Sequence, residues 1–321
     1  MTPSEPTIEV SHLVKRFGPF VAVSDLSFTV EPGEVFGLLG SNGAGKSTAI
    51  RMMCGLLTPT AGSCRILGID VAKDPEGVKR RIGYMTQRFS LYDDLTVDQN
   101  LEFFGGVYGL HGQAFRARRA WATSMSGLEG KEDLLTRSLP GGWKQRLALS
   151  CAVMHEPKVL FLDEPTGGVD PLSRRRFWAL IDTLAASGVT IIVTTHYLDE
   201  AERCDRIALM HAGLLVSLGT VAELKQVFAG RALLEVTCPR FLEAQARLEA
   251  EPFIHEAALF GTRLHIVVDD AEAGRRRTLE ILERDLNTPA AVERIVPSLE
   301  DVFIHCIEKE DAARAAREGT A

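Results

Sequence analysis

The sequence has no apolar run that could cross a bilayer. A spanning helix needs roughly 18 or more apolar residues, whereas the longest apolar segments of this 321-residue chain, 159–162 and 189–193, have the length of strands. The N-terminal segment 1–9 is polar and carries two prolines, so it does not predict a signal peptide. We therefore expect that, if the protein acts at a membrane, another chain supplies the membrane-spanning part.

Paired cysteines and an excess of positive charge are also missing. The six cysteines are Cys54, Cys64, Cys151, Cys204, Cys238 and Cys306. They form no CxxC pair and no spacing typical of a zinc site or a disulfide framework, which favours reduced thiols in a cytoplasmic protein. The chain has 36 Lys and Arg against 43 Asp and Glu, a formal net charge of −7. Because such a surface repels nucleic acid, we expect no nucleic-acid partner.

The composition, 45% apolar and 25% charged, suits a large globular domain followed by a smaller one. In residues 1–230, apolar strands alternate with amphipathic helices. Segments 159–162 and 189–193 are nearly continuously apolar, which is typical of strands buried on both faces of a mostly parallel sheet. Residues 172–184 between them have helical spacing. We predict an α/β domain over 1–230, with a helical arm inserted at about 88–155.

The sequence changes in character after Gly230, where short elements are predicted in the order β, α, β, β, α, β, α. That order resembles a ferredoxin-like split βαβ domain. The predicted elements are 232–237, 240–251, 255–260, 263–268, 273–286, 291–295 and 299–309. We therefore predict a small α+β accessory domain over 231–309, and a frayed or disordered tail over 310–321.

A complete phosphate-binding loop lies between Gly40 and Ser47 and reads Gly-Ser-Asn-Gly-Ala-Gly-Lys-Ser. It follows an apolar strand predicted at 34–39 and precedes a helix predicted from Lys46. The glycines allow backbone N–H groups to face phosphates, Lys46 can reach the β and γ phosphates, and the Ser47 hydroxyl can bind Mg²⁺. The predicted nucleotide-binding residues are Gly40, Ser41, Asn42, Gly43, Ala44, Gly45, Lys46, Ser47 and Thr48.

Two carboxylates, Asp163 and Glu164, directly follow the apolar segment 159–162. Open α/β sheets bind ligands at the carboxyl ends of their strands. Asp163 is therefore predicted to hold a magnesium ion. Glu164 is predicted to polarise the water that attacks the γ phosphate.

Six motifs in this order resemble those of the ATP-binding subunit of an ABC transporter. The phosphate loop corresponds to Walker A and is followed by a Q-loop at Gln87. A signature at 139–146, the acidic strand of Walker B, a D-loop at 168–170 and an H-loop at His196 come next. The resemblance covers roughly residues 7–225. It implies a P-loop NTPase of ABC type that binds ATP and Mg²⁺.

Residues 297–303 resemble the tail of ABC-2 type, daunorubicin-resistance-like exporter subunits. The resemblance implies a cytoplasmic ATPase, peripheral at the inner face of the membrane, that powers a separate integral membrane permease. It also implies that two such subunits, in a homodimer, enclose two ATP molecules. The segment 89–97 would receive the permease's coupling helix, with Leu91 and Tyr92 as apolar contacts.

The same resemblance assigns roles to single residues. Phe17 would stack on adenine with the help of Val23. Gln87 would bind Mg²⁺ or the attacking water. His196 would hydrogen-bond the γ phosphate and orient Glu164, so that these two residues and Gln87 form the catalytic set.

The signature departs from the family pattern Leu-Ser-Gly-Gly-Gln, because Pro140 and Trp143 replace the serine and the glutamine. A helix is expected to begin at Pro140, since proline is favoured at the first helical position. The N–H groups of Gly141 and Gly142 would then face the γ phosphate held by the partner subunit. Asp170 would lie across the same interface.

Two other functions remain open on the sequence alone. One is a soluble ABC ATPase that acts on ribosomes or DNA, although such proteins usually carry two cassettes or a long coiled-coil insertion. The other is a regulatory module that binds ATP with low turnover because its signature is altered. An ATPase assay of the subunit, alone and with a membrane partner, separates these hypotheses.

Overall fold

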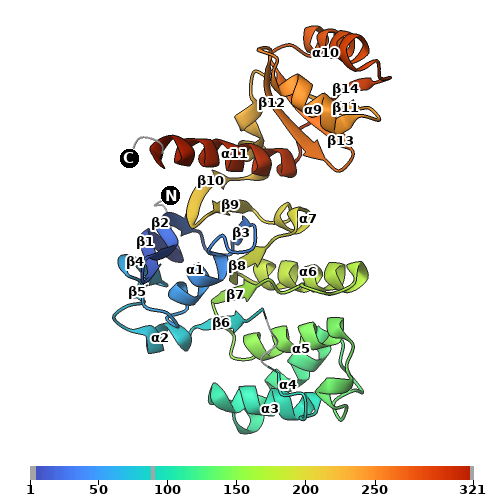
Figure 1. Ribbon diagram of the computed structural model, residues 1–321. Helices are drawn as coiled ribbons and strands as arrows, with labels where there is room; N and C mark the ends of the chain where they lie inside the picture. The colour runs from blue at the N-terminus through green and yellow to red at the C-terminus, as the bar shows by residue number, and fades with distance from the viewer. Residues whose placement is uncertain (1–4, 88–90, 319–321) are drawn as a thin grey trace. The chain divides into compact units, whose positions relative to one another are not determined.

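The computed structural model describes residues 5–87 and 91–318 and divides into two compact units, Met1–Leu218 and Gly219–Ala321. Figure 1 shows the order of the elements along the chain. All six cysteines lie among the described residues, where they are buried and form no disulfide bond. Among the described residues, no helix combines the length and the hydropathy that a membrane span requires.

The boundary between the units lies before the position near 230 that the composition indicates. Helix α8 (Val221–Leu224) and the 3-10 helix η2 (Lys225–Phe228) pack on the C-terminal helix α11 (Leu299–Glu318). The second unit begins at Gly219, so these two short helices belong to it together with α11.

A six-stranded sheet forms the centre of the first unit. Neighbouring strands from β9 through β3, β8 and β7 to β6 run parallel. Every residue of β3, β7 and β8 is buried, which confirms the strands predicted from continuous apolar runs. The strands, in order across the sheet, are β10 (Leu214–Gly219), β9 (Arg206–His211), β3 (Val35–Gly40), β8 (Thr190–Thr195), β7 (Val159–Asp163) and β6 (Ile82–Met85).

Helices of different lengths precede or follow these strands along the chain. Helix α1 (Lys46–Met53) begins at Lys46, as predicted, directly after the loop that leaves β3. Helix α6 (Pro171–Ala186) connects β7 to β8 over the segment predicted from its helical spacing. Helix α2 (Pro75–Lys79) precedes β6, and helix α7 (Leu198–Ala201) lies between β8 and β9. The carboxyl ends of β3, β7 and β8 consequently meet at one edge of the sheet.

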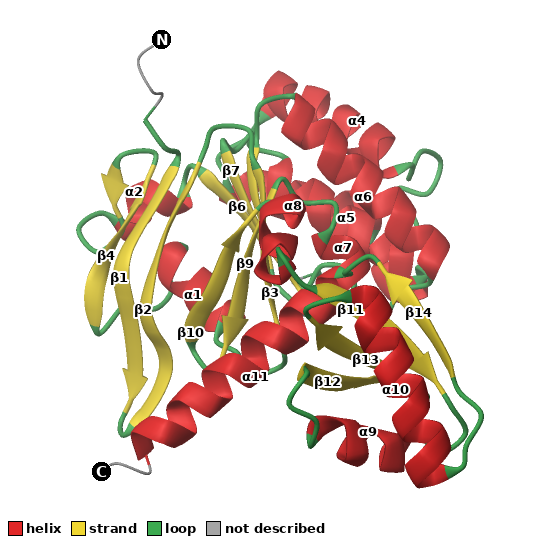
Figure 2. Cartoon of the chain, turned by 90° about the horizontal axis from the view of Figure 1, so that it is seen from above, coloured by secondary structure: helices red, strands yellow, loops and turns green. Residues whose placement is uncertain are grey.

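A four-stranded antiparallel sheet packs on the same core in the order β2-β1-β4-β5. The aromatic rings of Phe28 and Phe36, one from each sheet, stack with centroids 4.9 Å apart. Figure 2 shows β1, β2 and β4 side by side. The strands are β1 (Ile8–Phe17), β2 (Phe20–Val30), β4 (Ala61–Ile66) and β5 (Ile69–Asp70).

Three helices, grouped together in Figure 1, lie between β6 and β7 in the described part of the chain. They are α3 (Val97–Val107), α4 (Gly112–Ser126) and α5 (Gly141–Val153), with a short 3-10 helix η1 (Thr136–Ser138) before α5. Leu101, Ala122 and Leu147 belong to a core that these helices build among themselves. The helical character predicted for this region is therefore present in the structure.

The second unit has an antiparallel sheet in the order β12-β13-β11-β14. Helix α9 packs on β12 and β13, and α10 packs on β11 and β14. The order of elements agrees with the order predicted after Gly230. The elements are β11 (Ala232–Thr237), α9 (Phe241–Glu249), β12 (Ile254–Phe260), β13 (Arg263–Val268), α10 (Ala271–Leu286), β14 (Ala291–Ile295) and α11.

The disordered tail predicted from residue 310 is wrong over 310–318, where helix α11 continues to Glu318. This segment contains four alanines, at positions 312, 313, 315 and 316. Alanine has the highest intrinsic helix propensity, so the segment extends a helix that has already formed. Residues 319–321 lie outside the described residues.

Candidate nucleotide-binding site

The phosphate loop connects β3 to α1, and two of its glycines lie against backbone. A Cβ atom at Gly40 would come within 2.4 Å of the Met210 carbonyl oxygen. At Gly45, where φ is +101°, a Cβ would come within 2.5 Å of the Ala22 carbonyl oxygen. Only glycine fits these two positions, because no side chain can share the space of a carbonyl group. The loop and its neighbours border a cleft of about 380 Å³.

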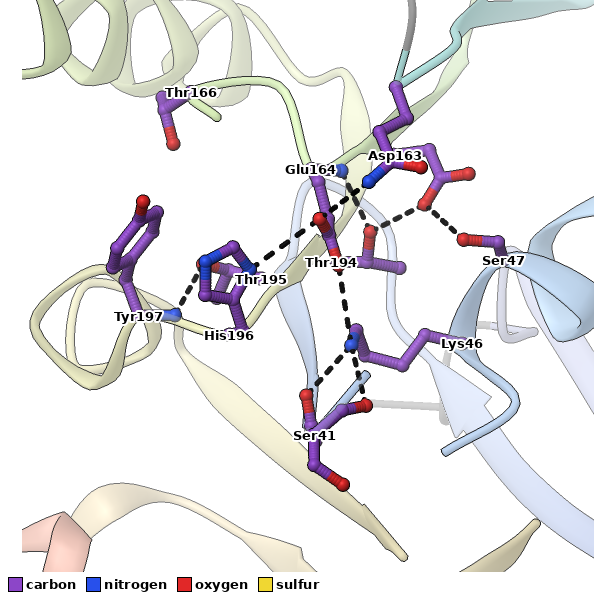
Figure 3. Close-up of polar contacts among 12 residues, drawn as sticks. Ser41, Lys46, Ser47, Asp163, Glu164, Thr166, Thr194, Thr195, His196 and Tyr197 are labelled. Carbon is purple, nitrogen blue, oxygen red and sulfur yellow. Dashed lines mark hydrogen bonds and ion pairs between the residues drawn. The ribbon is translucent and has the colours of Figure 1, made fainter. Parts of the chain in front are cut away.

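Lys46 and Ser47 line this cleft, and Asp163 lies against Ser47 (Figure 3). The ammonium group of Lys46, which is 4% exposed, donates to the carbonyl oxygens of Gly40 at 2.7 Å and Ser41 at 3.1 Å. The Ser47 hydroxyl donates to Asp163 Oδ1 at 2.9 Å. The two oxygens that the sequence predicts as magnesium ligands are therefore adjacent, although one comes from α1 and the other from β7.

Glu164 is the meeting point of the charged and polar groups at this edge of the sheet. Its carboxylate lies 3.4 Å from Lys46 Nζ and 3.5 Å from His196 Nδ1. Gln87 Nε2 donates to Glu164 Oε2 at 2.9 Å. Three residues that are distant in sequence thus contact one carboxylate, and of these contacts only that of His196 was predicted.

The backbone of Glu164 is held in the left-handed region, with φ of +46°. Such a conformation costs a non-glycine residue about 1–3 kcal/mol and persists only where neighbouring groups impose it. Here the Glu164 N–H donates to the hydroxyl of Thr194 at 2.8 Å, and that hydroxyl donates to Asp163 Oδ1 at 2.8 Å. One buried hydroxyl therefore fixes both acidic residues.

Buried groups behind Asp163 remain uncharged near neutral pH. Burial, reinforced by the negative charge of Asp163, raises the pKa of Tyr84 to about 12. Burial also raises the pKa of the Cys54 thiol, and electrostatic interactions with Cys64 and Asp163 add to this effect. The Tyr84 hydroxyl and the Cys54 thiol therefore add no negative charge beside Asp163 near neutral pH.

The aromatic residue on the cleft is Phe20, whereas Phe17 does not line it. The two residues pair across the β1–β2 hairpin and both are exposed. Val23 is fully buried under the loop, and its Cγ2 would lie 3.3 Å from a Cβ at Gly45. The cleft-lining residues are Phe20, Ala22, Asn42, Gly43, Ala44, Gly45, Lys46, Ser47, Thr48, Gln87 and Glu164.

The signature helix begins one residue later than predicted. Pro140 is the N-cap of α5, because its carbonyl oxygen accepts from the N–H groups of Trp143 at 2.9 Å and Lys144 at 3.1 Å. Gly141 and Gly142 are the first two residues of the helix. The structure does not bring them to the cleft of their own chain.

Asp170 has a visible role within its own chain. It is the N-cap of α6, and its Oδ1 accepts from the Ser173 N–H at 2.9 Å. Hydrogen bonds from Ser173 hold the pKa of the Asp170 carboxyl below its ordinary value. Ser173 also borders the signature, since a Cβ at Gly142 would come within 2.4 Å of the Ser173 hydroxyl oxygen. The two predicted interface motifs are therefore packed against each other.

The sequence and its relatives agree with this geometry. The family model described as ABC transporter matches residues 23–167. The daunorubicin/doxorubicin resistance ATP-binding protein DrrA of Streptomyces peucetius is 36% identical over 331 residues, which cover 98% of each chain. The chain belongs to the family of ABC transporter ATP-binding proteins.

A second relative shares more identity over a shorter part. The "Probable multidrug ABC transporter ATP-binding protein YbhF" of Escherichia coli is 53% identical over 224 residues, or 70% of this chain. This chain spans 39% of the length of YbhF. Among solved structures, an ATP-binding cassette dimer in a post-hydrolysis state with ADP and Pi is 25% identical, with a TM-score of 0.61. That match covers 66% of this chain and 98% of the cassette.

The segment 89–97, which by the ABC resemblance would receive the permease's coupling helix, is partly described. Phe89, at its start, lies outside the described residues. Tyr92 is exposed, and its ring meets that of Phe103 edge-on at 4.7 Å. Leu91 is partly buried and packs against the core of helices α3–α5.

Phe20 and Thr194 are two site residues that were not predicted from the sequence. Phe20 follows the predicted aromatic residue by only three positions, and sequence alone does not show which side of a hairpin faces the cleft. Thr194 did carry a signal, because a hydroxyl residue at the end of an otherwise apolar buried strand needs a hydrogen-bond partner. Its partners, Asp163 and Glu164, end the neighbouring strand.

Proposed function

We propose that this chain is the ATP-hydrolysing subunit of an ABC exporter and that it powers a separate membrane permease. The observation that carries the proposal is the convergence of Lys46, Gln87 and His196 on the single carboxylate of Glu164. A static nucleotide-binding module requires the phosphate loop but has no need for a carboxylate surrounded by these three groups. Turnover does require it.

The loop and its lysine would bind the nucleotide phosphates. The N–H groups from Gly43 to Thr48 and the amino end of α1 favour negative charge. Lys46 already lies at the carboxyl edge of the sheet, where phosphate oxygens can replace the carbonyl oxygens that it now contacts. We propose that Phe20, rather than Phe17, provides the apolar surface for adenine, because Phe20 lines the cleft.

The donor set fits Mg²⁺. This ion takes oxygen ligands and is usually bound by one or two carboxylates together with substrate phosphates, rather than by a cage of protein groups. Ser47 and Asp163 offer a hydroxyl and a carboxylate that are 2.9 Å apart, and the Gln87 amide oxygen could be a further ligand. Bound Mg²⁺ would neutralise charge on the β and γ phosphates.

Glu164 would accept a proton from the attacking water or orient it. Gln87 and His196 contact the Oε2 atom of Glu164 and would fix the direction of the carboxylate. His196 would also reach the γ phosphate. Positioning of this kind is the main contribution that a protein makes to phosphoryl transfer.

A second copy of the chain would complete the site. The first N–H groups of α5, at Gly141 and Gly142, have no role in the cleft of their own chain and could meet the γ phosphate of the partner. Asp170, beside them on α6, would lie at the same interface. The dimeric state of the related cassette with ADP and Pi supports this arrangement.

Helices α3–α5 would form the helical arm that contacts the permease at the inner face of the membrane. The support is an exposed apolar surface on and near this arm, which includes Tyr92, Phe103 and Val107. A cavity of about 800 Å³ adjoins it and is lined by Leu56, Tyr108 and Leu110, among others. The names of DrrA, for drug resistance, and YbhF, for a multidrug transporter, favour export.

We also propose that residues 231–309 form a ferredoxin-like accessory domain with a regulatory or dimer-stabilising role. The support is the antiparallel strand order β12-β13-β11-β14 together with the alternation of strands and helices. The domain holds none of the residues at the nucleotide cleft.

The experiment that tests the function is an ATPase assay of the purified chain, alone and reconstituted with its co-purifying permease. We expect Mg²⁺-dependent hydrolysis that the permease stimulates. The variant Lys46→Ala should lose nucleotide binding and hydrolysis together. Binding of ATP without turnover in both preparations would instead support the regulatory module.

A further inference from the structure

Glu200 is a buried carboxylate outside the nucleotide cleft. It belongs to α7, is 1% exposed, and is not among the cleft-lining residues. Its Oε2 accepts from the Thr195 hydroxyl at 2.8 Å, and its Oε1 accepts from the Thr166 hydroxyl. Burial of a carboxylate is costly unless the group is paired and hydrogen-bonded. Glu200 is both, so its position is tightly defined.

On one side, Glu200 determines the backbone around His196. The Thr195 hydroxyl donates to Glu200, and its oxygen accepts from the Tyr197 N–H at 2.9 Å. The residues before and after His196 are thereby tied to each other through one hydroxyl group (Figure 3). The backbone that carries His196 is thus fixed on both sides, at Thr195 and at Tyr197.

On the other side, Glu200 holds the loop that follows Glu164. Thr166 is two residues after Glu164, is 1% exposed, and donates its hydroxyl proton to Glu200. The Gly167 N–H then donates to the Glu164 carbonyl oxygen at 3.2 Å. The same carboxylate therefore accepts hydrogen bonds from both loops, the one after Glu164 and the one that carries His196.

Arg174 supplies the balancing charge. Its Nε lies 3.3 Å from Glu200 Oε1, and its guanidinium group lies 4.1 Å from the centre of the Tyr197 ring. The Tyr197 ring is in turn 4.1 Å from the imidazole of His196. Arg174 also lies 3.5 Å from Asp199, but Asp199 is 72% exposed and its pairing with Arg174 is correspondingly weak.

We propose that Glu200 is a positioning residue for ATP hydrolysis, which sets the spacing between Glu164 and His196 from behind the cleft. The inference rests on the proposed roles of these two residues. Glu164 Oε2 and His196 Nδ1 are 3.5 Å apart, and the two loops that set this distance meet at Glu200. A misplacement of about 1 Å can reduce a rate by about 100-fold.

The first arm of the test compares Thr195→Val with Thr195→Ser. Valine keeps the shape of threonine but removes the hydroxyl group, whereas serine keeps the hydroxyl group. We expect Thr195→Val to lower kcat about ten-fold or more, with the Kd for ATP within about two-fold of wild type, because the phosphate loop is unchanged. Thr195→Ser should restore most of the rate. Glu200→Gln, which retains the size of the side chain, should behave as Thr195→Val does.

The matched control is Asp199→Asn. It removes a carboxylate from the same helix and the same arginine, but from an exposed position. We expect kcat and Kd within about two-fold of wild type. A loss in this control equal to that in Glu200→Gln would overturn the proposal, because the effect would then reflect the charge of Arg174 rather than the position of His196.

The decisive arm repeats Glu200→Gln in a His196→Ala background. If Glu200 acts by positioning His196, its substitution should lower kcat by less than about two-fold when the imidazole is absent, since effects within one unit are not additive. An undiminished loss in that background, or a wild-type rate in both Thr195→Val and Glu200→Gln, would overturn the inference alone. A wild-type rate in His196→Ala by itself would overturn the proposed role of His196, which distinguishes the two failures.

Discussion

Single substitutions can show which aromatic residue, Phe20 or Phe17, stacks on adenine. Phe20 lines the cleft and is 63% exposed, whereas Phe17 lies on the other strand of the hairpin with Lys15 Nζ 5.1 Å from its ring centre. Stacking of a base on an aromatic ring is worth about 1–3 kcal/mol. Phe20→Ala should therefore raise the Kd for ATP about ten-fold, and Phe17→Ala should change it by less than about two-fold, as measured by nucleotide titration. A larger loss from Phe17→Ala would restore the assignment made from the motif.

Gly142 provides a second residue-scale prediction. A Cβ at this position would come within 2.6 Å of Ser173 Cβ, so α5 and α6 would have to separate. Overpacking of this kind costs about 1–3 kcal/mol. Gly142→Ala should therefore lower the thermal unfolding temperature of the full chain. Gly141→Ala is the matched control, because a Cβ at Gly141 would meet no atom within 4 Å.

The double variant Gly142→Ala/Ser173→Gly tests the cause of that loss. Removing the Ser173 side chain opens the space that the new methyl group needs, so most of the lost stability should return. Failure of the double variant to recover any stability would show that the contact with Ser173 is not the reason for a glycine at 142.

The motif residues could be predicted from the sequence because their order and spacing encode the chemistry directly. The strand before the loop, the helix from Lys46 and the carboxylates at the end of β7 all agree with the structure. Thr194 and Glu200 could not be predicted in the same way. Their contacts join residues of different strands and helices, and single-sequence patterns do not reveal such pairings.

At the scale of elements, helix α11 is fixed to the sheet of the second unit by a buried aspartate. Asp301 is 3% exposed, and its Oδ1 lies 2.6 Å from His265 Nδ1. Its Oδ2 accepts from both the N–H and the hydroxyl of Ser298, which precedes the helix. The segment 297–303 resembles the tails of exporter subunits in sequence. These contacts give a structural reason for the residues in it.

The ionisation of Asp301 should therefore contribute to the stability of this unit. Burial alone would raise the pKa of Asp301, but hydrogen bonds from His265 and Ser298 outweigh burial and hold the pKa below its ordinary value. A lowered pKa contributes stability that is complete above the ordinary aspartate value of about 3.9 and is lost as the pH falls through the folded-state value. Asp301→Asn should thus cost about 1.5–3 kcal/mol at pH 7, with a smaller difference from wild type below about pH 4.

Urea unfolding of the full chain at several pH values, followed in the second unit, measures this effect. Asp269→Asn is the matched control, since Asp269 pairs with His255 at 2.7 Å but is 76% exposed. Its substitution should cost less than about 1 kcal/mol. Equal losses for the two variants, or a loss in Asp301→Asn that does not depend on pH, would contradict this account of the helix.

Element boundaries show where single-sequence prediction fails in physical terms. Strands β11, β13 and β14 have the predicted bounds. Helix α11 was predicted to end at 309 because the last dozen residues are rich in Ala, Arg and Glu, which was interpreted as a frayed or disordered tail. The last turns form because alanine has a high helix propensity, and a pattern of apolar residues on one helix face does not reveal this.

At the scale of the whole molecule, the account requires two chains for one reaction. The cleft contains the loop, Gln87 and Glu164, but the signature glycines 141 and 142 do not line it. The structure of one chain therefore explains how phosphates and Mg²⁺ could be held, and a second copy would supply the donors that face the γ phosphate. The second copy is a proposal that rests on the resemblance to the ABC family, and the placement of these glycines away from the cleft of their own chain supports it.

The measurement that tests the central claim most directly is made on Glu164→Gln with ATP and Mg²⁺. The substitution keeps the size of the side chain and removes the negative charge 3.4 Å from Lys46, so it should not weaken phosphate binding. We predict that hydrolysis falls at least about 100-fold and that the variant elutes from a sizing column as a dimer retaining ATP, while Lys46→Ala elutes as a nucleotide-free monomer. Hydrolysis by Glu164→Gln at the wild-type rate would contradict the account.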